Sequence, residues 1–184
     1  MNKSFKSPVV ILAHGTFPIS KIPLDQLKSA GTVICTDGSV NNLSKLGLTP
    51  HVIIGDMDSI DSKYEFNGLK IHDNNTENSD LEKALNWVIM SNVSDITVLG
   101  STGLREDMTL ANLHILFHYY DKISIKLITD HFTVTCHKGE QSFDSFHGEN
   151  VSLFAQKLDS IVTTKSLKYQ LKDSSISPPQ KGIS

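Results

Sequence analysis

The sequence predicts an α/β protein in which a mostly parallel, Rossmann-like sheet with flanking helices is followed by a smaller β-rich domain. Over the first two thirds of the chain, strand-like apolar runs alternate with helix-like segments, which is typical of parallel sheets covered by helices. After about Asp130 the pattern changes to short runs with a period of two, broken by turn-forming residues. We therefore expect an α/β domain over residues 1–130 and a β-rich domain over residues 131–184.

Five apolar runs are the expected strands of the first domain. Their nearly continuous hydrophobic character indicates burial on both faces, as in the interior of a parallel sheet. In chain order they are Pro8–Ala13, Gly31–Cys35, His51–Gly55, Asp95–Gly100 and Ile123–Thr129.

Two helices are expected between these strands. The first covers Ser79–Met90, because Ser79 can cap its first turn and Glu82 stands three residues further on, as in a capping box. Its apolar stripe consists of Leu81, Ala84, Leu85 and Val88. The second runs from about Glu106 to Tyr119. Its predicted inward residues are Leu110, Leu113, Leu116 and Phe117.

The β-rich domain is predicted from four runs of alternating character. They are "HFTVTCH", "QSFDSF", "NVSLFAQ" and "SIVTTKSLKYQL", with the turn signals "KGE" and "HGEN" between them.

Composition and charge exclude several classes of function. The net charge of −3 provides no broad basic surface for a nucleic acid. No apolar run approaches the length of a membrane-spanning helix, so we expect no membrane partner. The only two cysteines, Cys35 and Cys136, have no paired spacing, which is typical of a reducing cytoplasm. A cytoplasmic protein with a small-molecule ligand is the expectation that remains.

Acidic and polar residues follow three of the predicted strands, where ligands bind in open parallel sheets. Asp37, Gly38 and Asn41 follow the second strand, and Asp56 and Asp58 follow the third. The segment "STGLRED" after the fourth strand contains Gly103, Arg105 and Asp107, and Asp80 stands at a helix start. Acids that converge from separate loops indicate a metal site.

This arrangement suits phosphoryl or pyrophosphoryl transfer from a nucleotide bound to Mg²⁺. Mg²⁺ prefers one or two carboxylates together with water and phosphate oxygens. Asp56 and Asp58 are two residues apart, so in an extended chain both would point to one side and share the metal. Arg105 would then offset charge on the transferred group.

Each element also has a structural explanation of its own. A D-x-D pair after a strand is common turn and capping chemistry, and Asp37-Gly38 alone is a normal turn. Asp80 can favour the positive end of a helix dipole, and Arg105 with Asp107 can be a surface pair of small energetic value. Together, the clusters favour a site.

Four motifs make the chain resemble the thiamine pyrophosphokinase family. The family patterns are approximately C-A-D-G-G-A-N-x-L, P-D-x-I-I-G-D-L-D-S-I, T-D-L-E-K-A-L and G-x-x-G-G-R-x-D-H-x-L-A-N. The chain has, in the same order, "CTDGSVNNL", "PHVIIGDMDSI", "SDLEKAL" and "GSTGLREDMTLAN". It departs from these patterns at Ser39, His51, Leu104 and Met108.

The resemblance implies transfer of pyrophosphate from Mg²⁺-ATP to the thiamine hydroxyl, giving thiamine diphosphate and AMP. It also implies an N-terminal α/β domain, a C-terminal β-sandwich, and a homodimer that binds thiamine between subunits. Asp56, Asp58 and Asp80 become the candidate metal ligands and, with Arg105 and Asp107, the catalytic residues. The implied nucleotide-binding residues are Asp37, Gly38, Asn41, Ser59, Thr102, Gly103 and Arg105. Asp107 and Ser184 are the implied thiamine-binding residues.

Two alternatives stay open at this point. A D-x-D nucleotide-sugar transferase would explain Asp56 and Asp58 but not "STGLRED" or the β-rich domain. A non-catalytic nucleotide-binding relative would keep the acids without turnover, and Ser39 and Met108 are consistent with it. The family normally continues through a G-x-S-N motif and a final strand, so the resemblance allows a truncated second domain.

Overall fold

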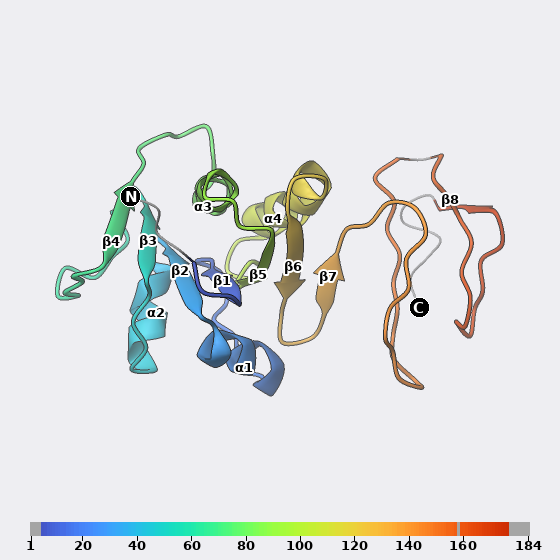
Figure 1. The fold of residues 1–184 in the computed structure, drawn as a ribbon, viewed down its shortest axis with the longest axis horizontal. Helices are drawn as coiled ribbons and strands as arrows, with labels where there is room; N and C mark the ends of the chain where they lie inside the picture. The colour runs from blue at the N-terminus through green and yellow to red at the C-terminus, as the bar shows by residue number, and fades with distance from the viewer. Residues whose placement is uncertain (1–4, 158, 177–184) are drawn as a thin grey trace. The chain divides into compact units, whose positions relative to one another are not determined.

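The computed structural model describes residues 5–157 and 159–176, which belong to two compact units, Met1–His137 and Lys138–Ser184 (Figure 1). No helix in the described part of the chain is long and apolar enough to cross a membrane.

The first unit is built on a seven-stranded sheet with the order β4-β3-β2-β1-β5-β6-β7. All neighbouring strands are parallel except β6 and β7, which are antiparallel. The strands are β1 (Val9–Leu12), β2 (Thr32–Thr36), β3 (Val52–Gly55), β4 (Leu69–His72), β5 (Asp95–Leu99), β6 (Ser124–Ile128) and β7 (Thr133–Thr135). The five predicted strands are all present, and their ends differ from the expected ones by one residue at most.

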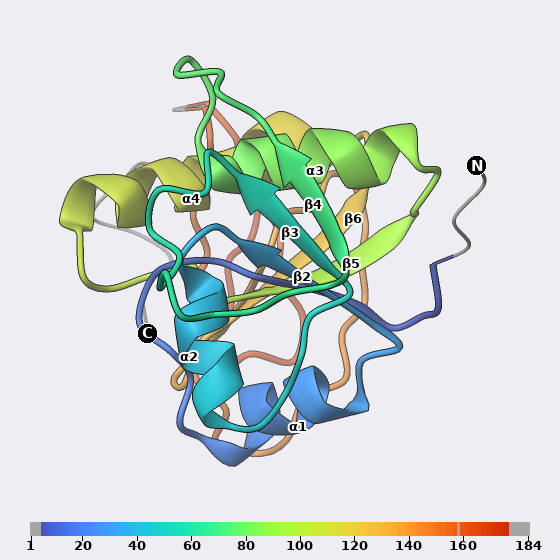
Figure 2. The same ribbon diagram turned by 90° about the vertical axis from the view of Figure 1, so that its left-hand side faces the viewer.

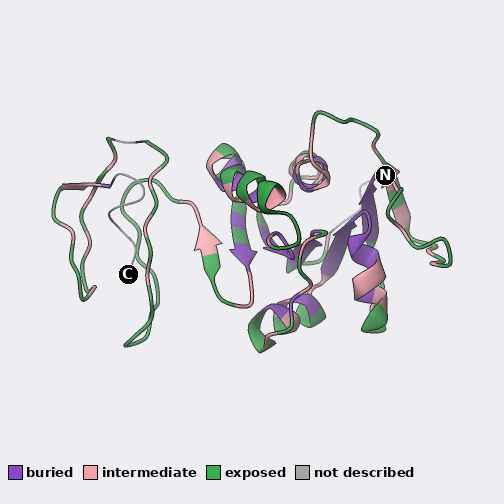
Figure 3. Cartoon of the chain, turned by 180° about the vertical axis from the view of Figure 1, so that it is seen from behind, coloured by how far each residue is buried: buried purple, intermediate pink, exposed green. Residues whose placement is uncertain are grey.

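Helices cover both faces of this sheet, so the unit has three layers (Figure 2). The helices α3 (Asp80–Met90) and α4 (Glu106–Tyr119) contribute to one apolar cluster, and α1 (Lys21–Ser29) and α2 (Ser39–Lys45) to the other. Buried residues concentrate in the sheet and on the helix faces against it (Figure 3). This packing confirms the predicted mostly parallel sheet with flanking helices.

The two predicted helices are confirmed. In α3 the Ser79 hydroxyl accepts a hydrogen bond from the Glu82 N–H, and the Glu82 carboxylate accepts one from the Ser79 N–H, which completes the capping box. The inward face predicted for α4 is partly wrong, because Leu110 is 62% exposed while Asn112 is buried. Apolar residues occur all round α4, so periodicity alone does not select a face.

Three elements of the first unit were not expected: α1, α2 and β4. The α2 sequence "SVNNLSK" has weak intrinsic helix propensity, and α1 contains Pro23. Both helices bury apolar residues against the sheet, among them Leu27 and Leu43. Tertiary packing therefore overrides a weak local signal. β4 is a four-residue edge strand, "LKIH", whose residues alternate between half-buried and exposed, and such a short run gives a weak signal in the sequence.

The β-rich region differs from the expectation in extent. The run "HFTVTCH" contains β7, which pairs with β6 and completes the first sheet, so the units divide at 137/138 instead of 130/131. In the described part of the second unit, β8 (Ile161–Val162) and β9 (Ser174–Ser175) form an antiparallel pair. "QSFDSF" and "NVSLFAQ" contain no strand in this structure. Alternation marks two faces, but a strand also requires a hydrogen-bonding neighbour.

Candidate functional site

The strand order reverses at the centre of the sheet, between β1 and β5. The chain adds β2, β3 and β4 on one side of β1 and then returns to place β5 and β6 on the other side. The loops that leave β1 and β5 are bonded to each other, since Gly15 N–H donates to Gly100 O and Thr16 N–H to Thr102 O, both at 2.8 Å. Ligands of open α/β sheets bind at such a reversal, outside the carboxyl ends of the strands.

Three carboxylates meet at this edge of the sheet. Asp37 follows β2, and Asp56 and Asp58 follow the neighbouring strand β3. Each offers one oxygen atom, and these atoms all lie within 4.8 Å of one another. The structure thus brings together three of the predicted acids from two loops, at a spacing that suits one divalent cation.

Asp37 is the buried member of this group, with only 3% of its surface exposed. Its Oδ2 accepts a hydrogen bond from the Ser59 N–H at 3.2 Å, but its buried Oδ1 has no hydrogen-bond partner. Burial raises the pKa of Asp37, the charges of Asp80 and Asp56 add to the rise, and the Ser59 hydrogen bonds oppose it. A buried, unpaired carboxylate oxygen beside two further carboxylates fits a Mg²⁺ ion, which binds oxygen ligands.

The Asp56–Asp58 segment is a tight turn. Met57 has a φ of 69°, and the Asp58 N–H donates to Asp56 Oδ1 at 3.3 Å. The Ser59 hydroxyl donates to Asp58 Oδ1 at 2.8 Å. The extended geometry expected for this pair is therefore wrong, although both carboxylates reach the cluster. The cause is local, because an aspartate readily bonds to the backbone N–H two residues later.

Asn41, in the first turn of α2, is hydrogen-bonded to the acidic loop, the segment 56–61 that carries Asp56 and Asp58. Its amide Nδ2 donates to Ser59 O at 2.8 Å, and its Oδ1 accepts from the Asp61 N–H at 3.0 Å. Asp61 is exposed, and its Oδ1 accepts from the Lys63 N–H, so it is a turn residue outside the carboxylate group. Asn41 thus shapes the loop through both ends of its side chain.

Asp80 is not a member of the three-carboxylate group. Its Oδ1 accepts a hydrogen bond from Lys83 Nζ at 2.8 Å, and the Lys83 side chain is only 6% exposed. Burial alone would lower the pKa of Lys83, but the bond to Asp80 and the charges of Asp73 and Asp56 outweigh it and raise the pKa. Sequence reasoning assigned no role to Lys83. The available signal was its position three residues after Asp80 on a helix.

Arg105 and Asp107 form an exposed, two-pronged ion pair before and within the first turn of α4. Arg105 Nε donates to Asp107 Oδ1 at 3.1 Å and Nη2 to Oδ2 at 2.6 Å. The bond from Arg105 holds the pKa of Asp107 below its usual range, and the same bond raises the pKa of Arg105. The guanidinium fork that meets this carboxylate has the geometry that also fits a phosphate.

Glycines at two predicted positions allow close packing of the loops. A Cβ at Gly103, where φ is 78°, would overlap the Thr16 hydroxyl. A Cβ at Gly38 would lie 2.5 Å from the His14 ring and 2.9 Å from Ser59 Cβ. His14 therefore stands beside the acidic loop, a position that sequence reasoning missed. The sequence does contain an indication of this position, because His14 follows a buried strand, as the predicted acids do.

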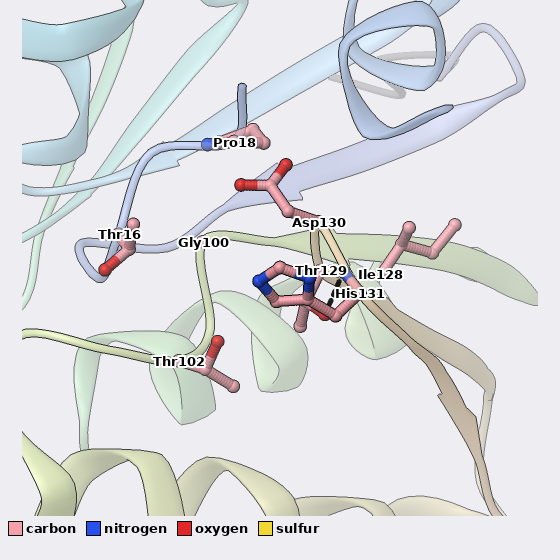
Figure 4. A pocket seen from close by; sticks show the side chains of 8 residues that line it. All are labelled: Thr16, Pro18, Gly100, Thr102, Ile128, Thr129, Asp130 and His131. Carbon is pink, nitrogen blue, oxygen red and sulfur yellow. Dashed lines mark hydrogen bonds between the residues drawn. The ribbon is translucent and has the colours of Figure 1, made fainter. Parts of the chain in front are cut away.

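A pocket of about 200 Å³ opens at the same edge of the sheet (Figure 4). Its lining comes from the loops after β1, β5 and β6: Thr16 and Pro18, Gly100 and Thr102, and the segment 128–131. Of the predicted site residues, Thr102 lines this pocket. Ser184, the other predicted thiamine-binding residue besides Asp107, lies outside the described residues.

The comparisons with known proteins agree on one family. Residues 24–128 match the family model described as "Thiamin pyrophosphokinase, catalytic domain". "Thiamin pyrophosphokinase 1" of Caenorhabditis elegans is 26% identical over 157 residues, which cover 76% of this chain and 64% of that protein. The chain thus spans less than two thirds of the length of this relative.

Solved structures of the same kind share the fold. The thiamine pyrophosphokinase of Bacillus subtilis superposes with a TM-score of 0.74 at 22% identity, over 96% of this chain and 88% of that one. A probable thiamine pyrophosphokinase of Staphylococcus saprophyticus superposes with a TM-score of 0.67 at 27% identity, over 91% and 86%. These neighbours confirm the predicted fold class, and the family model covers more than half of the sequence. The chain belongs to the thiamin pyrophosphokinase catalytic-domain family.

Proposed function

We propose that this chain transfers the pyrophosphoryl group of Mg²⁺-ATP to the hydroxyl of thiamine and acts as a cytoplasmic homodimer. In this reaction the hydroxyl oxygen attacks the β-phosphorus of ATP, and the bond between that phosphorus and the bridging oxygen of the α-phosphate breaks. AMP leaves with that oxygen, the hydroxyl proton is released, and thiamine diphosphate forms. The observation that carries the proposal is the convergence of Asp37, Asp56 and Asp58 around a buried, unpaired carboxylate oxygen.

The acidic residues would hold and align the metal. Asp37, Asp56 and Asp58 offer the oxygen ligands, and Asn41 keeps their loop in place. A bound Mg²⁺ would supply charge neutralisation for the phosphate oxygens. Asp80 joins this arrangement through the buried ammonium of Lys83, which balances part of the negative charge.

The loop after β5 would position the phosphates. Thr102 and Gly103 bring backbone groups close to the reversal of strand order. Arg105 would exchange the carboxylate of Asp107 for the transferred group and offset the charge that develops there. Since both side chains are exposed, their pairing in solution is weak, and the exchange has a small energetic cost.

One assay tests the proposal. The protein is incubated with Mg²⁺, ATP and thiamine, and the products are separated; AMP and thiamine diphosphate should appear in equal amounts. Asp58→Asn should remove most of this activity, whereas Asp61→Asn, a change of the same type in the same loop, should leave it intact. The homodimer is tested by light scattering at the assay concentration.

Three other outcomes would contradict the proposal. ADP without AMP would indicate a different phosphotransferase. Tight ATP binding without turnover would indicate a non-catalytic relative. Wild-type turnover by the Asp58→Asn variant at limiting Mg²⁺ would contradict the assignment of Asp58 as a metal ligand. The nucleotide-sugar transferase alternative gains no support from the family to which the chain belongs.

A further inference from the structure

The loop after β5, residues 101–105, is fastened to α4 by one threonine hydroxyl. Thr109 Oγ1 accepts a hydrogen bond from the Gly103 N–H at 3.0 Å and donates one to the Arg105 carbonyl at 3.0 Å. A threonine hydroxyl often bonds to the carbonyl four residues before it in a helix. Gly103 lies before α4, so its bond to Thr109 is not part of the helix and ties the loop to it.

The two bonds fall on either side of a strained residue. Leu104 has a φ of 65°, and the Arg105 N–H donates to Gly103 O across it at 2.8 Å. These are features of the rare, strained form of the γ-turn. Such strain persists only where the surrounding structure holds it, and it concentrates at functional sites. The Leu104 side chain is 72% exposed, so packing does not hold it, whereas Thr109 bonds to both of its neighbours.

Arg105 is the residue that this turn places. It directly follows Leu104 and is the N-cap residue of α4. Its side chain is 68% exposed, so little packing restricts the guanidinium. The point from which this side chain leaves the backbone is therefore set by the turn at Leu104, and the turn is held by Thr109.

A second side chain of α4 holds the beginning of the same loop. Asn112 lies three residues after Thr109, on the same side of the helix, and its Nδ2 donates to Ser101 O at 2.7 Å. The buried Asn112 Oδ1 and Ser101 Oγ have no hydrogen-bond partner among the described residues. Because unpaired buried polar atoms lower stability, stability alone does not explain an asparagine at this position. Its attachment to the loop does.

We propose that Thr109 is a positioning residue, whose hydroxyl holds the strained turn at Leu104 and thereby places the Arg105 guanidinium at the transferred group. Asn112 supports it by fixing the start of the loop. This role rests on the proposed function, because it takes Arg105 to offset the charge of the transferred group. Thr109 contacts no reacting atom and acts only through Arg105.

The test compares Thr109→Val with the wild type. Valine is close to threonine in shape but can neither donate nor accept a hydrogen bond, so both bonds are lost. Thr109→Ser keeps the hydroxyl and is the rescue variant. Thr49→Val is the matched control, since Thr49 is exposed and precedes the amino end of β3, the opposite edge of the sheet.

We expect Thr109→Val to lower kcat for thiamine diphosphate formation by about ten- to a hundredfold, because a small displacement of a catalytic group is costly in rate. The KM for thiamine should stay within about twofold, since only an interaction of the transition state is lost. Thr109→Ser should recover kcat to within about threefold of the wild type, and Thr49→Val should not change it.

A second background separates positioning from a merely structural role. In an Arg105→Ala protein, Thr109→Val should lower kcat by less than about twofold, because the group that Thr109 places is already gone. Its effect on urea unfolding should be the same in both backgrounds, since the bonds of Thr109 go to backbone atoms that Arg105→Ala keeps. Exchange of the Gly103 amide hydrogen, followed by NMR, should be about two- to tenfold faster in Thr109→Val.

Three results would overturn the positioning role. A kcat of Thr109→Val within about twofold of the wild type would show that the turn does not need the hydroxyl. Equal losses of kcat with and without Arg105 would show that Thr109 does not act through this arginine. Failure of Thr109→Ser to recover kcat would assign the loss to shape instead of hydrogen bonding. Absence of turnover in the wild type would refute the proposed function, and the Gly103 exchange rate would still show whether Thr109 holds the loop.

Discussion

Asp37→Asn should stabilise the metal-free protein, because this substitution removes the repulsion between the charge of Asp37 and the charges of Asp56 and Asp58. The carboxylate oxygens of Asp37, Asp56 and Asp58 lie within 4.8 Å of one another. Each pair then repels by about 1 kcal/mol in water and by about 3 kcal/mol at the effective dielectric constant near a protein surface. Asp56 and Asp58 are exposed, so the lower figure applies to their pairs with Asp37. Asparagine can still accept from the Ser59 N–H, and the expected gain in unfolding free energy is about 2 kcal/mol.

The gain should depend on pH in a defined direction. The folded-state pKa of Asp37 is raised above its value in the unfolded chain. The folded wild type therefore binds a proton more tightly, and its stability falls as the pH rises from about 4 through the folded-state pKa. The advantage of Asp37→Asn should accordingly be absent below about pH 4 and complete above the folded-state pKa.

Urea unfolding with and without Mg²⁺ measures both effects. Mg²⁺ at ten times its dissociation constant should stabilise the wild type by about 1.4 kcal/mol. It should not stabilise Asp37→Asn to the same extent, while Asp61→Asn should respond as the wild type does. The reasoning is refuted if Asp37→Asn is less stable than the wild type without metal at neutral pH, or if Mg²⁺ stabilises both proteins equally.

Three further changes test other parts of the site by thermal or urea unfolding. Leu104→Gly should raise the free energy of unfolding by up to about 1 kcal/mol, because Leu104 is 72% exposed and has a φ of 65°, a left-handed conformation that glycine adopts without strain. The same change at Leu110, which is exposed but helical, should lower the free energy of unfolding by about 1 kcal/mol. Equal losses at both positions would contradict this reasoning. Asn41→Ala should lower the free energy of unfolding by about 2 kcal/mol and weaken Mg²⁺ binding, because two hydrogen bonds to the acidic loop disappear. Unchanged Mg²⁺ affinity would show that Asn41 does not hold the acidic loop in its metal-binding shape. Lys83→Met should lower the free energy of unfolding by about 2 kcal/mol, because Asp80 would keep its charge without its buried partner. An unchanged free energy of unfolding would contradict a stabilising pair between Lys83 and Asp80.

Local signals in the sequence were sufficient for the central sheet and for α3. Continuous apolar runs mark buried parallel strands, and Ser79 with Glu82 marks a helix start wherever it occurs. The same reasoning failed for α2, whose asparagine-rich sequence becomes helical because Val40 and Leu43 pack on the sheet. It also selected the wrong face of α4 at Leu110, since that choice depends on the neighbours of the helix.

By itself, the sequence determined that acids follow two strands of a parallel sheet, and four motifs in order pointed to the family. Only the tertiary structure decided which acids meet. Asp37 joins Asp56 and Asp58 because β2 and β3 are neighbours, whereas Asp80, at the start of α3, is engaged by the buried Lys83. The pocket at Asp130 likewise depends on three strands that are distant in sequence and adjacent in the sheet. Distances between separate loops follow from strand order and helix packing, and no local pattern contains them.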